Sequence, residues 1–293
     1  MINYHQAQIT CDLLDSLCGI NYSNCELLLV DNGLLEDSTT LFQQHHADVK
    51  VINSKENLGF AGGNNLAIKQ AKGDYILLLN NDTIVPPNFL EPMVQLMENQ
   101  PKIGIVSPKI YFYDAPNTLQ YAGTNTLNFR TGRGNDPAKK SIDNGQYDQL
   151  KKVSMAHGAC MLIRKAVIDD IGLLSEDYFL YYEELDFCER ARQSGWDIYF
   201  TPNSYIHHRE SSSVGKFSPL KTHYMFRNRW LFIRKFGGAD YWPFVFYFLF
   251  VSIPLNVLRF LKKGDWKHIR ALWDAVVWNL SEKENRTQKS IGY

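Results

Sequence analysis

Three groups of polar residues in this chain combine residue types and spacing that could carry chemistry. The first is Asn80-Asn81-Asp82, which follows the apolar run from Tyr75 to Leu79. A carboxylate at the end of a buried strand can hold a hard divalent cation, and one Asp is sufficient because Mg²⁺ usually keeps several waters. The alternative is a plain turn, a role in which Asn, Asp and Thr are common.

The second group is a cluster of carboxylates, Glu183, Glu184 and Asp186, directly after an aromatic run at residues 178–182. Crowded carboxylates beside apolar surface raise one another's pKa, which suits a general base that accepts a proton from a hydroxyl group. The alternative is structural, because acidic residues favour the first turn of a helix, where they face the positive end of its dipole.

The third group is the pair His207-His208, which follows a strand-like segment from Trp196 to Phe200 and a predicted turn at Pro202-Asn203. A neutral imidazole at this point could complete a metal site begun by Asp82. The alternative is a histidine pair in a solvated loop.

A glycine-rich loop precedes these groups, and residues 57–65 read Asn-Leu-Gly-Phe-Ala-Gly-Gly-Asn-Asn. Its glycines do not have the G-x-G-x-x-G spacing of a dinucleotide site, and the chain has no Gly-Lys-Ser/Thr of a P-loop, so both of these site types are excluded. What remains is a loop whose backbone can approach a phosphate or a ribose closely at the start of a helix.

The elements that must position these groups are short apolar runs alternating with helical stretches. We predict strands at Leu27 to Val30, at Val49 to Ile52 and at Tyr75 to Leu79, with a helix after the glycine-rich loop. This alternation indicates an α/β fold with a doubly wound, parallel sheet, in which ligands gather beyond the carboxyl ends of the strands. Asp31 and Asp82 lie at such ends.

Two later segments bear on the same region. The stretch from Asn117 to Gln149 is rich in Gly, Asn, Asp and Thr, and we expect a long irregular excursion that could cover a site. A helix is expected to begin near Glu183 and to end at Gly195.

Composition excludes several classes of function. The net charge is zero, so no global field attracts nucleic acid, and we expect no nucleic-acid partner. The five cysteines are odd in number and form no CxxC pair, which argues against a disulfide framework and a zinc ribbon and favours a reducing compartment. The amino terminus lacks the basic start and apolar stretch of a secretory signal, so the catalytic part is expected in the cytosol.

The region beyond Lys216 is dominated by basic and aromatic residues. Tyr241 to Leu258 carries no charge and approaches the roughly 20 residues that span a bilayer, with basic residues on both flanks. Because positive charge on both sides gives no preferred orientation, interfacial attachment is favoured over a true span, and both over a buried core helix. Trp266 to Leu280 is expected to form an amphipathic helix.

Taken in order, these segments resemble the family-two glycosyltransferases, particularly their rhamnosyltransferase-like branch. The resemblance extends from Asn3-Tyr4 to His208. No single motif identifies the family, but the order and spacing of the motifs together are specific to it. Besides the glycine-rich loop, the motifs are Val-Asp-Asn, Leu-Leu-Asn-Asn-Asp-Thr, His-Gly-Ala-Cys-Met-Leu-Ile-Arg, Tyr-Tyr-Glu-Glu-Leu-Asp-Phe-Cys-Glu-Arg-Ala-Arg and Pro-Asn-Ser-Tyr-Ile-His-His.

The resemblance implies a GT-A type, Rossmann-like fold with a mixed, mainly parallel sheet flanked by helices. Residues 1–215 would form the catalytic domain, with a truncated first strand, and residues 216–293 a membrane-associating helical region. Tyr4 and Asp31 would lie against the nucleotide base. The remaining residues expected to face the nucleotide sugar are Asn57, Gly59, Asn80 and Asn81.

The resemblance also implies the reactive groups. Asp82 falls in the DxD position and would bind Mg²⁺ or Mn²⁺, and through it the donor diphosphate, with His208 as an additional ligand. Glu184 aligns with the acid that deprotonates the acceptor. Glu183 and Asp186 are the alternative candidates for this base. Direct displacement at the anomeric carbon would invert its configuration.

The expected activity is therefore transfer of rhamnose or another hexose from a nucleoside diphosphate sugar to a lipid-linked or polysaccharide acceptor in cell-envelope glycan synthesis. It would take place on the cytoplasmic side of the cell membrane, with the protein peripheral, monotopic or held by a single span.

Four departures from the family pattern keep two alternatives open. The chain starts inside the expected first strand, Leu34-Leu35-Glu36 replaces Ser-Thr-Asp, Asn80 replaces the first acid of DxD, and Ser175 stands where an Asp usually precedes Glu176. The first alternative is a catalytically degenerate, membrane-bound scaffold of the same fold. The second is a sugar nucleotidyltransferase, which would need a basic, glycine-rich amino-terminal loop that the sequence does not show.

Overall fold

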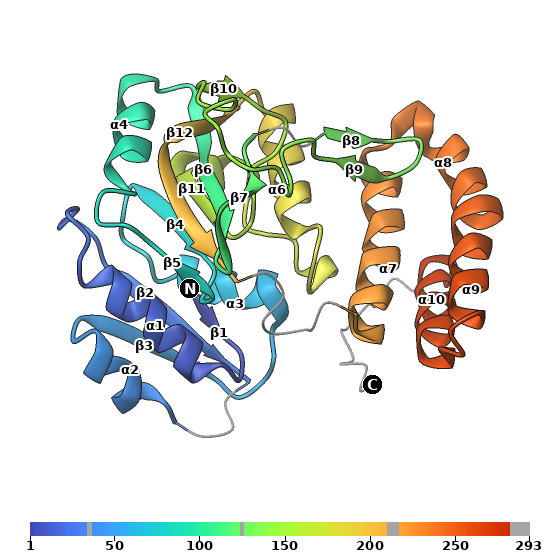
Figure 1. The fold of residues 1–293 in the computed structure, drawn as a ribbon, viewed down its shortest axis with the longest axis horizontal. Helices are drawn as coiled ribbons and strands as arrows, with labels where there is room; N and C mark the ends of the chain where they lie inside the picture. The colour runs from blue at the N-terminus through green and yellow to red at the C-terminus, as the bar shows by residue number, and fades with distance from the viewer. Residues whose placement is uncertain (34–36, 124–125, 210–216, 282–293) are drawn as a thin grey trace.

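A computed structural model describes residues 1–293 except 34–36, 124–125, 210–216 and 282–293. An α/β lobe forms the first part of the chain, and a lobe of long helices follows it (Figure 1). The expected departure at Leu34-Leu35-Glu36 and the expected boundary between residues 215 and 216 lie outside the described residues.

The amino-terminal part forms a three-stranded parallel sheet in the order β1-β2-β3. Its strands are β1 (Ile2–Asn3), β2 (Leu27–Asn32) and β3 (Val49–Ser54), and the helices that accompany them are α1 (Ala7–Leu17), α2 (Thr39–His45) and α3 (Gly59–Ile68). The two longer strands contain the apolar runs predicted from the sequence. Leu29 and Val30 are fully buried, as a strand covered on both faces requires.

A second, mixed sheet carries the rest of the α/β lobe. Its main path is β10 (Lys151–Lys152), β12 (Asp197–His208), β6 (Ile103–Phe112), β11 (Cys160–Arg164) and β4 (Tyr75–Leu79), while β5 (Thr83–Ile84) pairs with β12 and β7 (Ala115–Tyr121) with β6. Helices α4 (Glu91–Asn99), α5 (Lys165–Ile171) and α6 (Glu183–Gln193) accompany it. β6 and β12 run parallel, whereas the other pairs in this sheet are antiparallel. The predicted mixed sheet flanked by helices is confirmed. The prediction that it is mainly parallel is wrong for this sheet, because β11 lies between β4 and β6 and runs antiparallel to both.

The predicted turn at Pro202-Asn203 is wrong. β12 continues through it to His208, and the register with β6 shifts between Thr201 and Tyr205. A bulge of this kind leaves residues out of the hydrogen-bonded ladder, so it accommodates a proline that has no N–H to donate. As a result His208 lies on a strand rather than in a loop.

A cavity of about 600 Å³ separates the start of β2 from β4. Met1, Leu28, Leu77 and Leu79 are among its lining residues, and the Met1 nitrogen donates to the carbonyl oxygen of Leu28 at 3.0 Å. β1 spans two residues only. The expectation of a truncated first strand stays a prediction.

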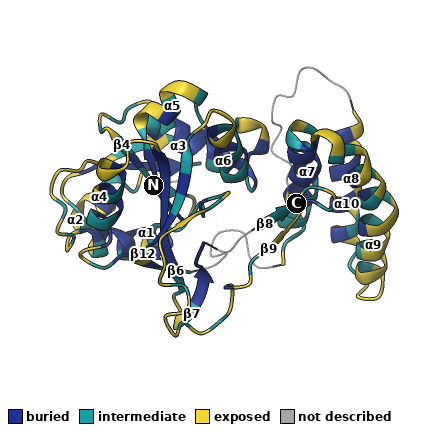
Figure 2. Ribbon diagram, turned by 90° about the horizontal axis from the view of Figure 1, so that it is seen from above, coloured by how far each residue is buried: buried dark blue, intermediate teal, exposed yellow. Residues whose placement is uncertain are grey.

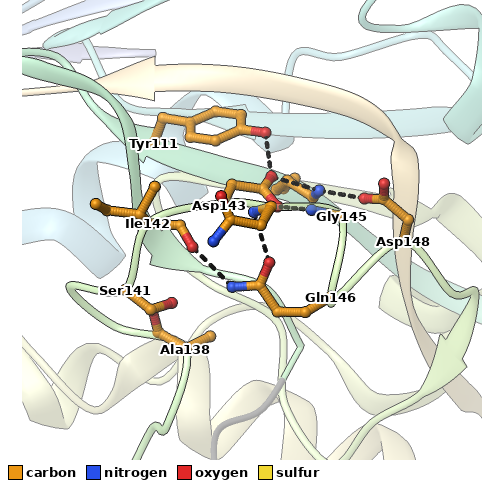
Figure 3. Close-up of polar contacts among 10 residues, drawn as sticks. Tyr111, Ala138, Ser141, Ile142, Asp143, Gly145, Gln146 and Asp148 are labelled. Carbon is orange, nitrogen blue, oxygen red and sulfur yellow. Dashed lines mark hydrogen bonds and ion pairs between the residues drawn. The ribbon is translucent and has the colours of Figure 1, made fainter.

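The segment expected as an irregular excursion contains β7 and a hairpin of β8 (Thr126–Asn128) and β9 (Arg133–Asn135). Its later part is fastened to β6 by a polar cluster (Figure 3). Lys109, with a side chain only 5% exposed, lies 2.7 Å from a carboxylate oxygen of Asp143 and 2.5 Å from one of Asp148. The hydroxyl of Tyr111 donates to Asp143. Although burial alone would raise it, hydrogen bonds from Lys109 and Tyr111 hold the pKa of Asp143 below its usual value.

We expect Lys109→Met to lower the free energy of unfolding by about 3 kcal/mol, because it leaves the buried Asp143 carboxylate without its cation. Denaturant titration of the purified protein measures this loss. The double variant Lys109→Met with Asp143→Asn should recover part of it, since no uncompensated charge is then buried. Equal stability of Lys109→Met and the parent would contradict the assignment.

The helical lobe consists of α7 (Pro219–Phe236), η2 (Gly238–Asp240), α8 (Tyr241–Tyr247), the π-helical turn η3 (Phe248–Ser252), α9 (Ile253–Leu261) and α10 (Trp266–Leu280). The predicted amphipathic helix matches α10. Within the described residues, the stretch Gly238–Leu261 is long and apolar enough to cross a membrane, but such a helix alone is weak evidence of membrane association. Only 17% of its apolar window is buried, so it is not a core helix, and Figure 2 shows exposed residues along α9.

Candidate active site

The pairing of β5 with β12 brings the two predicted metal ligands together. Thr83 is the register partner of His208, which sets the preceding Asp82 beside the imidazole. His208 Nε2 lies 3.0 Å from Asp82 Oδ1, and both side chains are 7% exposed. The neighbouring His207 faces the other side of the sheet, where its ring lies 5.6 Å from Tyr111, because alternate residues of a strand point in opposite directions.

The orientation of the His208 imidazole is set by Gln120 on β7. His208 Nδ1 lies 2.7 Å from the Gln120 amide oxygen, and both residues are buried. An amide oxygen only accepts, so Nδ1 carries a hydrogen, and Nε2 is directed towards Asp82 Oδ1 and also lies 3.4 Å from Asn80 Nδ2. This is the arrangement in which a histidine serves as a metal ligand supported by an outer hydrogen bond.

The Asp82 and His208 pair fits a divalent cation. Asp82 Oδ1 is buried and makes no hydrogen bond to any described residue, although the imidazole is close. Neighbouring ligands of an octahedral ion with bonds of about 2.1 Å lie about 3.0 Å apart, which matches this spacing. No cluster of three or more His, Cys, Asp or Glu side chains that could hold a metal occurs among the described residues. A site with one carboxylate and one imidazole suits an ion that also binds water and phosphate oxygens.

A chain of buried hydrogen bonds connects this point to the end of β2. Asn81 Nδ2 donates to Thr10 Oγ1 at 2.9 Å, and that hydroxyl donates to Asn3 Oδ1 at 2.9 Å. Asn3 Nδ2 then donates to Asp31 Oδ1 at 2.8 Å. The other carboxylate oxygen of Asp31 is buried and has no hydrogen-bond partner among the described residues.

One oxygen of Asp31 is therefore open to a donor that the described residues do not supply. It is 4% exposed, and burial raises its pKa, which the hydrogen bond from Asn3 partly offsets. A buried carboxylate oxygen without a partner costs free energy, and a ligand N–H group would remove that cost. The imide or amide edge of a nucleobase carries such a group.

Hydrogen bonds from Asn32 hold the glycine-rich loop beside Asp31. Asn32 Oδ1 accepts from the Leu58 N–H at 2.8 Å, and its Nδ2 donates to Asn57 Oδ1 at 3.1 Å. Gly59 has a φ of +68°, and a Cβ there would lie 2.3 Å from the carbonyl oxygen of Phe179, so only glycine fits. Tyr4, which is 37% exposed, packs its ring against Gly33 next to this loop.

The acidic cluster at the start of α6 follows a loop of unusual backbone conformation. Glu184 lies against Gly158, where an added Cβ would be 3.6 Å from its Cβ and Cγ. The carbonyl oxygen of the next residue, Ala159, accepts the backbone N–H of Asn80, so Glu184 adjoins the end of β4 that leads to Asp82. Burial raises the pKa of Glu184. Glu183 is more deeply buried, and burial and then the charge of Glu184 raise its pKa well above the usual value.

Both carboxylate oxygens of Asp186, the third acid of the cluster, already have partners within the protein. It is fully buried, and one carboxylate oxygen lies 2.6 Å from Arg190 Nε. The other oxygen accepts from Lys235 Nζ and from the hydroxyl of Tyr178. Because both oxygens are occupied, the geometry favours Glu184 over Asp186 as the base.

Several residues near the site were not predicted as members of it. Gln120 comes from the excursion, and its role depends on the β6 and β7 pairing rather than on a local motif. His157 belongs to the His-Gly-Ala-Cys motif, and its ring lies 6.0 Å from that of His208. Arg209 donates its backbone N–H to the Asp82 carbonyl oxygen at 2.9 Å and pairs with Asp12.

The fold is that of a class of protein, the GT-A glycosyltransferases. Solved structures of this class superpose on the chain. Staphylococcus aureus TarS 1-349 aligns with a TM-score of 0.59 and 17% identity, covering 94% of this chain and 78% of that one. The mannosyltransferase PcManGT of Pyrobaculum calidifontis, in complex with GDP-Man and Mn²⁺, aligns with a TM-score of 0.56 and 15% identity over 97% of this chain and 86% of that one. At such identity these likenesses support the fold alone.

The sequence identifies the family. The model of glycosyl transferase family 2 matches residues 1–172, and the chain belongs to this family. It is 29% identical over 237 residues to the low-salt glycan biosynthesis hexosyltransferase Agl10 of Haloferax volcanii, which covers 79% of this chain and 73% of that relative. It is 22% identical over 209 residues to the N-acetylglucosaminyl-diphospho-decaprenol L-rhamnosyltransferase of Mycobacterium tuberculosis, covering 65% and 68%.

A further relative is much longer than this chain. The uncharacterized protein y4gI of Sinorhizobium fredii is 30% identical over 206 residues, but the match spans only 22% of its length. The predicted family and its rhamnosyltransferase-like relatives are confirmed.

Proposed function

We propose that the protein is an inverting glycosyltransferase that moves rhamnose or another hexose from a nucleoside diphosphate sugar to a lipid-linked or polysaccharide acceptor. The observation that carries this proposal is a pair of buried carboxylate oxygens that accept no hydrogen bond from the described residues, Asp31 Oδ2 and Asp82 Oδ1. Asp82 Oδ1 lies 3.0 Å from His208 Nε2, and a hydrogen-bonded network runs from Asp31 to Asn81, the residue before Asp82. One end suits a nucleobase edge and the other a cation.

In this proposal Asp82 and His208 hold Mg²⁺ or Mn²⁺, which when bound neutralises charge on the departing diphosphate. Asp31 accepts an N–H from the base, while Tyr4, Asn57, Gly59, Asn80 and Asn81 border the donor. Glu184 takes the proton from the acceptor hydroxyl. As the hydroxyl oxygen forms its bond to the anomeric carbon, the bond from that carbon to the diphosphate oxygen breaks on the opposite side, so configuration inverts.

The relatives support the reaction class and the acceptor class. The Haloferax protein is named a glycan biosynthesis hexosyltransferase, and the mycobacterial protein transfers L-rhamnose to a sugar on diphospho-decaprenol, according to its name. TarS has been solved with UDP-GlcNAc and PcManGT with GDP-Man and Mn²⁺. By chemical class, the proposed donor of this chain is therefore a nucleoside diphosphate sugar and the proposed acceptor a lipid-linked glycan or a polysaccharide.

The test is a panel of UDP, dTDP and GDP sugars incubated with the purified protein and Mn²⁺ or Mg²⁺, with release of nucleoside diphosphate as the signal. We expect one donor to be turned over and the signal to be lost with EDTA. Calorimetry with the matching nucleoside diphosphate should give weaker binding for Asp31→Asn. A degenerate scaffold would bind none of the nucleotides, and a nucleotidyltransferase would release pyrophosphate from a nucleoside triphosphate instead. Either result would overturn the proposal.

The exposed side chains of the helical lobe support attachment to a membrane surface, which we propose is the cytoplasmic face. Trp242, Phe246 and Phe250 recur at helical spacing and are 65 to 72% exposed, whereas Phe244 and Phe248 between them are buried against α7. Further exposed apolar side chains on α9 and α10 are Leu255, Leu258, Trp266, Trp273 and Leu280. Exposed basic residues accompany them at Arg259, Lys262, Lys263 and Lys267. An apolar face bordered by basic residues suits an anionic lipid surface.

We expect the double variant Phe246→Ser with Phe250→Ser to bind anionic vesicles about 100-fold more weakly, because it removes two aromatic side chains from the inserted face. Sedimentation with phosphatidylglycerol-containing liposomes measures the partition. Ile142→Ser, which alters an exposed apolar residue of the α/β lobe, is the matched control and should not change it. Binding that survives the double variant would exclude this face.

A further inference from the structure

The loop that precedes the acidic cluster is held in a conformation that its own residues disfavour. Phe179, Tyr181 and Tyr182 have φ values of +62°, +68° and +78°. Bulky side chains rarely adopt positive φ, and each such residue costs on the order of 1–3 kcal/mol. Tyr182 is the residue before α6, so this backbone sets where Glu183 and Glu184 begin. Something outside the loop must stabilise it.

Asn228 on α7 contacts this loop at several points. It is fully buried, and its Nδ2 donates to the carbonyl oxygens of Tyr178, Leu180 and Tyr181 at 2.9, 2.8 and 2.7 Å. Its Oδ1 accepts from Arg227 Nε at 2.7 Å. Because carbonyl oxygens only accept, the orientation of the Asn228 amide is fixed by its neighbours.

Arg227, also on α7, makes further hydrogen bonds to this loop. Its guanidinium donates to the carbonyl oxygens of Asp177 and Tyr178. On the other side of the loop, the Phe179 carbonyl oxygen accepts from the Phe60 N–H at 2.7 Å, directly after Gly59. The loop therefore connects the helical lobe with both the glycine-rich loop and the acidic cluster.

We propose that Asn228 is a positioning residue that holds this loop so that Glu184 faces the acceptor hydroxyl. The proposal rests on the proposed function of Glu184 as the base. Asn228 acts through the backbone from Tyr178 to Tyr182, in which it keeps Phe179, Tyr181 and Tyr182 at positive φ. A displacement of about 1 Å at a reacting group can cost about 100-fold in rate, so a modest shift of this loop has a large effect.

The docking of α7 does not depend on Asn228 alone. Lys235 near the end of α7 pairs with Asp186, and Arg229 on α7 donates to Ser252 Oγ at 3.1 Å. Substitution of Asn228 should therefore release the loop while the helix stays in place. This separation makes a test possible in which folding and positioning are measured independently.

The main variant is Asn228→Asp, which keeps the size of the side chain. It places a carboxylate oxygen, which cannot donate, opposite the loop carbonyl oxygens that accept from Nδ2 in the parent protein. We expect kcat for glycosyl transfer to fall about 100-fold, with the donor KM and the affinity for nucleoside diphosphate changed less than about 3-fold. Asn279→Ala is the control, because it removes another buried amide of the same lobe without touching the loop. Its kcat per folded protein should equal that of the parent.

A second measurement distinguishes positioning from a general loss of structure. In a Glu184→Gln background, Asn228→Asp should lower kcat by less than about 3-fold, because residues that act as a unit are not additive. A full 100-fold loss in that background, or an unchanged kcat in the single variant, would overturn the proposal.

If Asn228→Asp does not fold, Asn228→Ala replaces it, with activity normalised to nucleotide-binding stoichiometry. Absence of transfer by the parent protein would instead refute the proposed function, so the two failures are distinguishable.

Discussion

Replacement of Asp82 by alanine is expected to lower kcat about 1000-fold, equivalent to about 4 kcal/mol of transition-state stabilisation. The carboxylate is the only acidic group beside His208 Nε2 among the described residues, and its Oδ1 has no other hydrogen bond there. In the proposed mechanism Asp82 would hold the cation that balances the charge of the leaving diphosphate, and the variant loses this ligand. Turnover at saturating Mn²⁺ with the donor found in the panel measures the effect.

The controls for Asp82 use the surrounding residues. Asp15→Ala, which changes an exposed aspartate of α1 paired with His45, should leave turnover unchanged. Gln120→Ala should be intermediate, because loss of an outer hydrogen bond to a ligating histidine typically weakens metal affinity 10- to 100-fold. Unchanged turnover in Asp82→Ala would remove the basis for the metal site.

Replacement of Glu184 by glutamine is expected to lower kcat by about 10²- to 10⁴-fold while donor binding stays the same. Glutamine keeps the shape and cannot accept a proton at neutral pH. Glu189→Gln on the same helix is the matched control, since Glu189 pairs with Arg192 at the surface. If Glu183→Gln and not Glu184→Gln abolished turnover, the two roles would have to be exchanged.

The pH dependence of the parent enzyme follows from the same residue. The proposed base works as a carboxylate, and burial raises the pKa of Glu184 above that of an ordinary glutamate. Activity should therefore be full above the raised pKa and fall as pH decreases through it, at a higher pH than for an exposed glutamate. The Glu184→Gln variant should lose this acidic limb. The measurement is kcat/KM against pH at fixed ionic strength.

The local elements of the fold were predictable because their signals are short in range. Tyr75 to Leu79 is an unbroken apolar run ended by polar residues, and β4 has those bounds. Trp266 to Leu280 has a helical apolar period and an Asp in front of it, and the side chain of Asp265 caps α10 by accepting from the His268 N–H. In both cases burial on a regular face and local capping act together.

The candidate site was predictable only in part. Asp31, Asp82 and the acidic cluster stand at element ends that the sequence indicates, and the structure brings Asp82 to His208. Gln120 could not be found, because only the long-range pairing of β7 with β6 brings it to the imidazole. The ion pair between Asp186 and Lys235 could not be predicted either, because α7 follows much later in the chain.

The short β5 strand has a consequence for how the protein is made. Asp82 is synthesised well before His208, and the two meet only when the end of β12 has paired with β5. During translation, a nascent chain that ends before β12 therefore contains Asp82 but not His208, so it has only one of the two proposed cation ligands. Binding of Mn²⁺ should strengthen sharply once this last strand is in place, so the ion would favour the completed sheet over earlier folding intermediates.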